Sequence, residues 1–202
     1  MRRAIAHLKR ADPILRDIME RVGPCRIQYA EPDFETLARS IVFQQLSGAS
    51  ARAIFARLKA TTGDEARMTP AGILALGEEE LRAVGLSKQK SRYLRDLAEK
   101  AGAGTVDFSC LGRLPDAEVI AHLTVVKGVG VWTAQMYLLF ALRRPDVLAA
   151  GDLGIRSAIR KAYHLRRPPT PKRVEALGAA WRPYRSVACW YLWRSTAPVL
   201  IT

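Results

Sequence analysis

Apolar residues recur every three or four positions along most of the chain, which is the spacing that places them on one face of a helix. No stretch alternates apolar and polar residues for long enough to form a sheet. The pattern therefore predicts an all-α fold. Helices are expected over residues 1–22, 34–41, 49–61, 78–84, 88–98, 116–123, 131–142, 152–163 and 171–181, with others starting at Pro70 and containing Trp190 and Trp193.

Several helix boundaries carry specific signals. Thr69-Pro70 and Thr170-Pro171 each combine a capping threonine with proline at the first helical position, where proline loses no hydrogen bond. Pro13 either kinks the first helix or begins its second half. The other expected boundaries are N-caps at Asp33 and Ser87, a stop at Gly23-Pro24, and helix ends at Gly63 and Gly85.

Gly128 and Gly130 separate the helices expected over 116–123 and 131–142. Because neither glycine carries a Cβ, the chain can turn tightly and bring its N–H groups close to an anion. The positive end of the following helix points at the same place, which favours a phosphate. A glycine pair alone is also typical of a helix C-cap and connector. The pattern predicts a helix-hairpin-helix unit over 116–142.

The chain carries a large excess of positive charge, with 32 Lys and Arg against 19 Asp and Glu in 202 residues, a net charge of +13. Such an excess favours a polyanionic partner, above all nucleic acid. The alternative is a basic protein whose charged faces are simply solvated. Nucleic acid is therefore the favoured partner.

Cys25, Cys110 and Cys189 are odd in number and far apart, which argues against a disulfide framework or a metal site. They are interpreted as packing residues in a reducing compartment. The N-terminus lacks the continuous apolar segment of a signal peptide, and no apolar run is long enough to cross a bilayer. These features predict a cytoplasmic protein that does not enter membranes.

Four stretches together resemble the helix-hairpin-helix DNA glycosylase superfamily, and within it the alkylbase branch represented by bacterial 3-methyladenine DNA glycosylase II. They are Leu123-Thr-Val-Val-Lys-Gly-Val-Gly-Val-Trp-Thr-Ala134 with the later Asp152-Leu-Gly154, Ser40-Ile-Val-Phe-Gln-Gln-Leu-Ser47, Gly85-Leu-Ser-Lys-Gln-Lys-Ser-Arg-Tyr-Leu94, and Trp181-Arg-Pro-Tyr-Arg-Ser-Val-Ala-Cys-Trp-Tyr-Leu-Trp193. The resemblance covers residues from about 30 onward and preserves the order of the motifs.

The resemblance implies a single two-lobed helical glycosylase domain over 1–202, without the N-terminal β-rich domain of larger members. One lobe is expected from about 1–40 with 155–202 and the other from 41–154, with the active cleft between them. It also implies the reaction: base-excision repair by hydrolysis of the N-glycosidic bond of alkylated purines such as 3-methyladenine. The target base is first flipped out of double-stranded DNA, and the protein is expected to act as a monomer.

Asp152 matches the catalytic aspartate of this family. Judged by its position alone, just before a predicted helix, it is an N-cap. The two interpretations are compatible, because a helix N-terminus favours an ionised carboxylate. Cleavage of the bond between base and sugar builds positive charge on the sugar, and a fixed anion stabilises that charge.

The resemblance places Trp132, Met136 and Trp193 in the base pocket. An alkylated base is cationic and leaves without a general acid, and an indole ring can recognise it by cation–π stacking. The alternative for both tryptophans is core packing. Met136 stands where some relatives have a tyrosine. Trp132 occupies the place of the nucleophilic lysine in members that also cut the strand, so a monofunctional enzyme is expected.

The remaining matches concern DNA and ions. Leu46 corresponds to the wedge that fills the gap left by the flipped nucleotide, with Gln45 and Ser47 near the minor groove. The alternative is a polar loop with one buried leucine. Phosphate contacts are expected at Lys127, Gly128 and Gly130, and a monovalent cation, Na⁺ or K⁺, at the carbonyls of Thr124, Val126 and Val129. No cofactor is required, and the cysteine spacing excludes the iron–sulfur cluster of some relatives.

Two other functions remain open. One is a glycosylase for a different base, such as uracil, hypoxanthine or an oxidised purine, which the tryptophan pair disfavours. The other is a helix-hairpin-helix module that binds DNA without catalysis. Such a module does not require Asp152, Leu46 and an aromatic pocket together.

Overall fold

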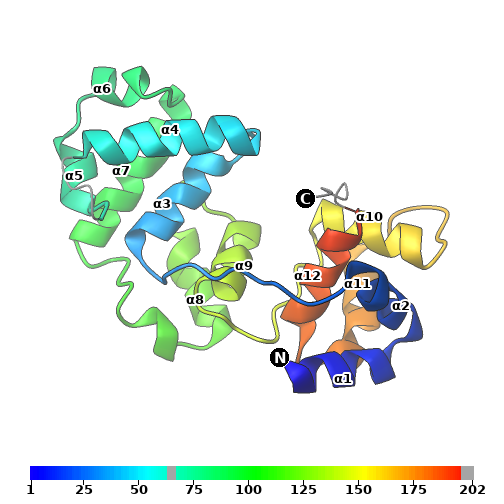
Figure 1. Cartoon of the computed structure of the whole chain (residues 1–202). Helices are drawn as coiled ribbons and strands as arrows, with labels where there is room; N and C mark the ends of the chain where they lie inside the picture. Colours follow the sequence, from blue (N-terminus) through cyan, green and yellow to red (C-terminus); the bar gives the residue numbers. More distant parts are fainter. Residues whose placement is uncertain (63–66, 197–202) are drawn as a thin grey trace. The chain divides into compact units, whose positions relative to one another are not determined.

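The computed structural model describes residues 1–62 and 67–196, and every regular element within these ranges is a helix (Figure 1). The predicted all-α fold is confirmed. The helix end expected at Gly63 lies outside the described residues. None of the described helices has the length and apolar character needed to cross a membrane.

The chain forms two compact units, one from residues 1–29 and 143–202 and the other from residues 30–142. Both boundaries lie about ten residues before the expected ones near 40 and 154. The reason at the first boundary is that Leu37 and Ile41 are buried where their helix packs on helices of the middle unit. At the second, Val147 N–H donates to Ser186 Oγ at 2.9 Å, which fixes this segment to the C-terminal helix. Asp152 therefore belongs to the unit formed by the chain ends.

The middle unit surrounds one long helix, α7, which contacts α3, α5 and α6. Leu94 and Leu97 of α7 are buried in its core. Its elements are α3 (Phe34–Phe43), α4 (Gly48–Thr61), α5 (Pro70–Ala75), α6 (Glu78–Ala83), α7 (Lys88–Gly102), the 3₁₀ turn η1 (Leu111–Arg113), α8 (Asp116–Thr124) and α9 (Val131–Phe140). The N-caps expected at Asp33, Thr69 and Ser87 are confirmed, because each side chain accepts a backbone N–H of its helix.

The unit formed by the chain ends packs its last helix, α12, against α2 and α10. Its elements are α1 (Arg2–Ala11), α2 (Pro13–Val22), α10 (Leu153–Ala162), α11 (Pro171–Gly178), the 3₁₀ turn η2 (Ala179–Trp181) and α12 (Arg185–Thr196). Pro13 begins a separate helix, since Asp12 caps α2 through Ile14 and Leu15. The same carboxylate accepts hydrogen bonds from Trp181 and Tyr163, so it joins α2 to the later helices.

Candidate functional site

The hairpin between α8 and α9 uses its two glycines differently. Gly128 has a φ of +81°, and a Cβ on it would lie 2.1 Å from Cδ2 of Tyr93 in α7. Gly130 has a φ of −94°, and a Cβ there would meet nothing within 4 Å. Both glycines are exposed; a side chain would find open space at Gly130, whereas at Gly128 the absence of a Cβ permits the turn and its close packing against Tyr93. Gly130 is the N-cap of α9, so no capping side chain competes for the first N–H groups of that helix.

Lys127 is held to α7 through Asp96. Its backbone N–H donates to Asp96 Oδ2 at 2.8 Å, and its Nζ lies 3.6 Å from Asp96 Oδ1 while the side chain remains 74% exposed. Burial raises the pKa of Asp96, but the hydrogen bonds from Lys100 and Lys127 and their charges outweigh it and hold the pKa below its ordinary value. The side chain of Lys127 is thus available to a phosphate, whereas its N–H is already used.

The carbonyls of Thr124, Val126 and Val129 lie within or beside the hairpin turn. Val126 O accepts the Val129 N–H at 3.0 Å and keeps a second lone pair. Among the backbone hydrogen bonds of turns, loops and helix caps in the described residues, none ends on the carbonyl oxygen of Thr124 or Val129. Oxygen donors of this kind fit a hard monovalent cation, so the residues present suit the ion that the resemblance implies.

The middle unit contains a pocket of about 550 Å³ that gathers several predicted site residues. Its lining is Arg39, Ser40, Phe43, Gln44, Gln45, Gly128, Trp132, Thr133 and Met136. Trp132 is 49% exposed, so core packing is wrong for this residue. Sequence reasoning missed Arg39, whose guanidinium lies 4.5 Å from the ring centroid of Phe43. The signal was present, because both residues lie on the face of α3 opposite the buried Leu37 and Ile41.

Residues 44–47 form a short loop between α3 and α4. Gln45 has a φ of +56°, and Leu46 is 40% exposed, so the alternative of a buried leucine is wrong. Ser47 Oγ accepts the Ser50 N–H at 3.3 Å and caps α4. Gln44 Nε2 donates to Gly128 O at 2.9 Å. The loop that carries the proposed wedge is therefore joined directly to the hairpin.

Asp152 is the N-cap of α10, as its position predicts. Its Oδ1 accepts the Ile155 N–H at 2.7 Å and Trp193 Nε1–H at 2.9 Å. Trp193 is half-buried, and its indole N–H is directed at this carboxylate. A Cβ on Gly154 would lie 3.0 Å from Asp152 Oδ1 and 3.1 Å from Trp193 Cδ1, which explains the glycine in the Asp152-Leu-Gly154 motif.

The predicted residues thus fall into two groups. Asp152 and Trp193 contact each other in the unit of the chain ends, while Trp132, Met136, Gln45, Leu46, Ser47, Lys127, Gly128, Gly130 and the carbonyls of Thr124, Val126 and Val129 belong to the middle unit. Within the middle unit, the pocket, the loop over 44–47 and the hairpin share residues and contacts.

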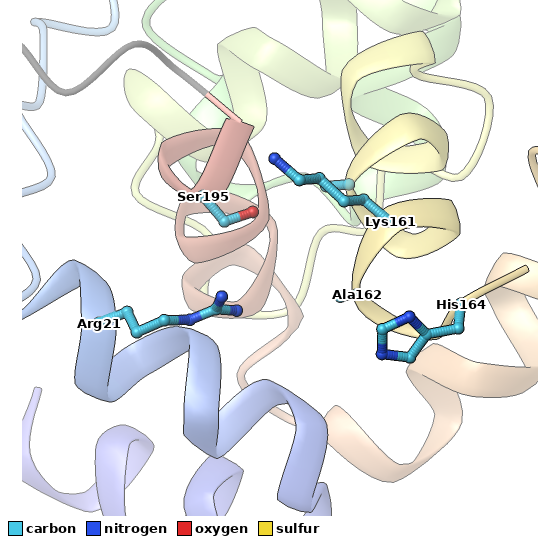
Figure 2. Close-up of a pocket in the computed structure, with 6 residues that line it drawn as sticks. Arg21, Lys161, Ala162, His164 and Ser195 are labelled. Atoms are coloured by element: carbon cyan, nitrogen blue, oxygen red, sulfur yellow. The ribbon is translucent and has the colours of Figure 1, made fainter.

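A smaller pocket of about 360 Å³ in the unit of the chain ends contains none of the predicted residues (Figure 2). It is lined by Arg21, Ala158, Lys161, Ala162, His164 and Ser195. Arg21 and Lys161 lie in the last turns of α2 and α10, where basic side chains balance the negative end of the helix dipole. Arg21 Nε also donates to Asp17 O at 3.4 Å. The positions of Arg21 and Lys161 are therefore accounted for by their favourable interaction with the C-terminal ends of α2 and α10.

Comparisons with known proteins show what the sequence and the fold are similar to. A family described as "HhH-GPD superfamily base excision DNA repair protein" matches residues 38–183. DNA-3-methyladenine glycosylase 1 of Schizosaccharomyces pombe is 34% identical over 96% of this chain and 87% of that protein. The solved structure of the S. pombe 3-methyladenine DNA glycosylase with abasic DNA has a TM-score of 0.84 at 35% identity, covering 95% of both chains. The solved structure of a DNA-3-methyladenine glycosidase from Bacillus halodurans has a TM-score of 0.82 at 35% sequence identity, and the match covers 94% of this chain and 87% of that one.

Proposed function

The chain belongs to the HhH-GPD superfamily of base excision DNA repair proteins, and we propose that it is a monofunctional DNA glycosylase for 3-methyladenine and related alkylated purines. The observation that carries the proposal is the carboxylate of Asp152, held at the start of α10 by a backbone N–H and an indole N–H. The relatives named as 3-methyladenine glycosylases supply the substrate class. We include a monomeric state and a cytoplasmic, nucleoid-associated location in the proposal; the net charge of +13 supports the monomeric state, through repulsion between copies, and the association with DNA.

Asp152 acts on the sugar of the target nucleotide. Departure of the base leaves positive charge on the sugar ring, and the carboxylate stabilises that charge and orients the attacking water. Both hydrogen bonds to Asp152 Oδ1 fix the direction of the carboxylate before reaction. Such preorganisation is effective because no reorientation is needed as the charge develops. A base that is already cationic needs no proton donor, which is consistent with a single catalytic carboxylate.

The pocket beside Trp132 accepts the extruded base in this proposal. The exposed indole offers an electron-rich face to a flat cation, and Met136 adds a polarizable thioether to the same pocket. A volume of about 550 Å³ is sufficient for a purine. Met136 sets the breadth of the substrate range, because its flexible side chain tolerates purines of different shapes.

DNA is held by the hairpin and the loop over 44–47. The N–H groups at the start of α9 and the side chain of Lys127 bind phosphate, and Gln45 and Ser47 approach the minor groove. The carbonyls of Thr124, Val126 and Val129 would hold a monovalent cation that adds positive charge beside the same phosphate. Leu46 enters the space vacated by the flipped nucleotide, for which its exposed side chain is suited.

The assignment is tested by incubating the protein with methylated DNA and with duplexes containing uracil, hypoxanthine or an oxidised purine. Release of free 3-methyladenine is expected. Tight binding to methylated DNA with no released base would make the chain a non-catalytic DNA-binding module. Preferential release of a base from one of the other duplexes would mean that the chain is a glycosylase for that base.

Leu46→Ala should lower excision from a paired duplex more than from a mismatched site, because the mismatch already weakens stacking and pairing. The measurement is single-turnover excision on both substrates. Leu74→Ala is the matched control. Leu74 lies in the same unit but outside the loop, and its exposed fraction of 38% is similar to that of Leu46. Equal losses on both substrates in Leu46→Ala would contradict the wedge role.

Trp193→Phe should slow single-turnover excision by about tenfold, because it keeps an aromatic ring but removes the N–H that orients Asp152. Trp190→Phe is the control: Trp190 packs edge-on against Tyr191 on the same helix, a ring contact that phenylalanine can also make. An unchanged rate in Trp193→Phe would show that the ring, not its N–H, matters.

Borohydride added during the reaction should trap no covalent adduct between protein and DNA. A Schiff base needs a lysine amine at the sugar, and Trp132 stands at the position where strand-cutting members of the superfamily carry that lysine. The assay is gel electrophoresis of the borohydride-treated mixture. A trapped band that disappears in Lys127→Ala would instead make the enzyme bifunctional, with Lys127 as nucleophile.

A further inference from the structure

The side chain of Lys90 joins α7 to the start of the loop that carries Leu46. Its Nζ donates to Val42 O and to Gln44 O, both at 2.6 Å. These carbonyls lie at and just after the C-terminal end of α3, where the helix supplies no N–H partner for them. Lys90 is half-buried, and this partial burial lowers the pKa of its ammonium. The main chain is thus held on both sides of Phe43.

The same helix also holds the hairpin. Tyr93 packs against Gly128, and Asp96 accepts the N–H of Lys127 at 2.8 Å. Lys90, Tyr93 and Asp96 are spaced three residues apart, so they share one face of α7. That face supports both segments through which the protein is proposed to hold DNA.

The loop needs such support. Gln45 has a φ of +56°, a conformation that a residue with a Cβ keeps only when its surroundings fix it. Gln44 is fixed twice, since its carbonyl accepts from Lys90 and its side chain donates to Gly128 O. Leu46 follows within two residues, so the direction in which its side chain leaves the loop depends on these anchors.

We propose that Lys90 is a positioning residue for base extrusion: by fixing the carbonyls of Val42 and Gln44, it orients Leu46 for insertion into the duplex. The inference deepens, and rests on, the proposed glycosylase function and the wedge role of Leu46. Lys90 contacts neither the base nor the sugar in this role. Its contribution reaches the reaction through the loop.

Lys90→Met tests the proposal, because methionine keeps a long apolar stem and removes the donors. Single-turnover excision is measured on a paired duplex and on a mismatched one. For each variant, the rate on the paired duplex is divided by the rate on the mismatched duplex. The ratio is independent of how much of the variant is folded. We expect Lys90→Met to lower the ratio at least about tenfold. Lys88→Met, an exposed lysine on the same helix, removes one charge and should leave the ratio unchanged.

A double-mutant cycle with Leu46→Ala separates positioning from simple helix capping. If Lys90 acts through Leu46, adding Lys90→Met to Leu46→Ala changes the ratio by less than about twofold. An unchanged ratio in Lys90→Met alone, or independent losses in the double variant, would overturn the proposal. Failure of the wild-type protein to release any methylated base would instead overturn the glycosylase assignment, so the two failures are distinguishable.

Discussion

Asp152→Asn should release 3-methyladenine at least about a hundredfold more slowly than the wild type in single turnover, because losing one preorganised electrostatic group costs on the order of 10²–10³ in rate. The substitution keeps the geometry of the site. Asparagine caps a helix as well as aspartate, and its Oδ1 can still accept from Ile155 and Trp193. Stability should therefore fall by no more than the dipole contribution of roughly 0.3–1 kcal/mol.

Asp33→Asn is the matched control for this prediction. Asp33 caps α3 through the Thr36 N–H at 2.9 Å, so the same chemical change is made at a second helix N-terminus. The control should keep the rate of base release, whereas Asp152→Asn should melt close to the wild type and bind methylated DNA as the wild type does, but release the base slowly. Rapid release by Asp152→Asn would leave Asp152 as a helix cap only.

The helices could be predicted from the sequence because their signals are local. Thr69-Pro70 and Asp33 act within one turn of the helices they begin, and the structure confirms both caps. Asp152 was predicted in the same way, as the N-cap of α10. The contact of Asp152 with Trp193 was not predicted, because it joins residues 41 positions apart and depends on how α10 packs against α12.

The supports of the DNA-binding segments could not be read from the sequence for the same reason. Lys90 bonds to Val42 across 48 positions, and Asp96 bonds to Lys127 across 31. A lysine and an aspartate on a predicted helix are most often solvated, and nothing in their spacing indicates which carbonyl or N–H they meet. The unit boundaries were misplaced because burial of Leu37 and Ile41 decides where α3 belongs, and burial is a tertiary property.

Gly128→Ala should lower both stability and DNA affinity, and it separates the two roles that a glycine can have in the hairpin. An added Cβ meets Tyr93 Cδ2 at 2.1 Å and must keep a φ of +81°. Strain and overlap of this size cost about 2–4 kcal/mol, which lowers the melting temperature by roughly 5–15 °C. A displaced hairpin also weakens its charge-assisted bonds to phosphate, and losing one reduces duplex affinity about 10–100-fold.

Gly130→Ala is the matched comparison, because it makes the same substitution in the same hairpin at a position where an added Cβ has no close neighbour. Its Cβ would point into open space at a φ of −94°, so the melting temperature should stay close to that of the wild type. Duplex affinity should still fall, since the methyl group stands where a phosphate approaches α9. Adding Tyr93→Leu to Gly128→Ala should restore part of the lost stability by relieving the overlap, leaving only the cost of the positive φ. Equal melting temperatures for Gly128→Ala and Gly130→Ala would mean that Tyr93 moves freely and does not fix the hairpin.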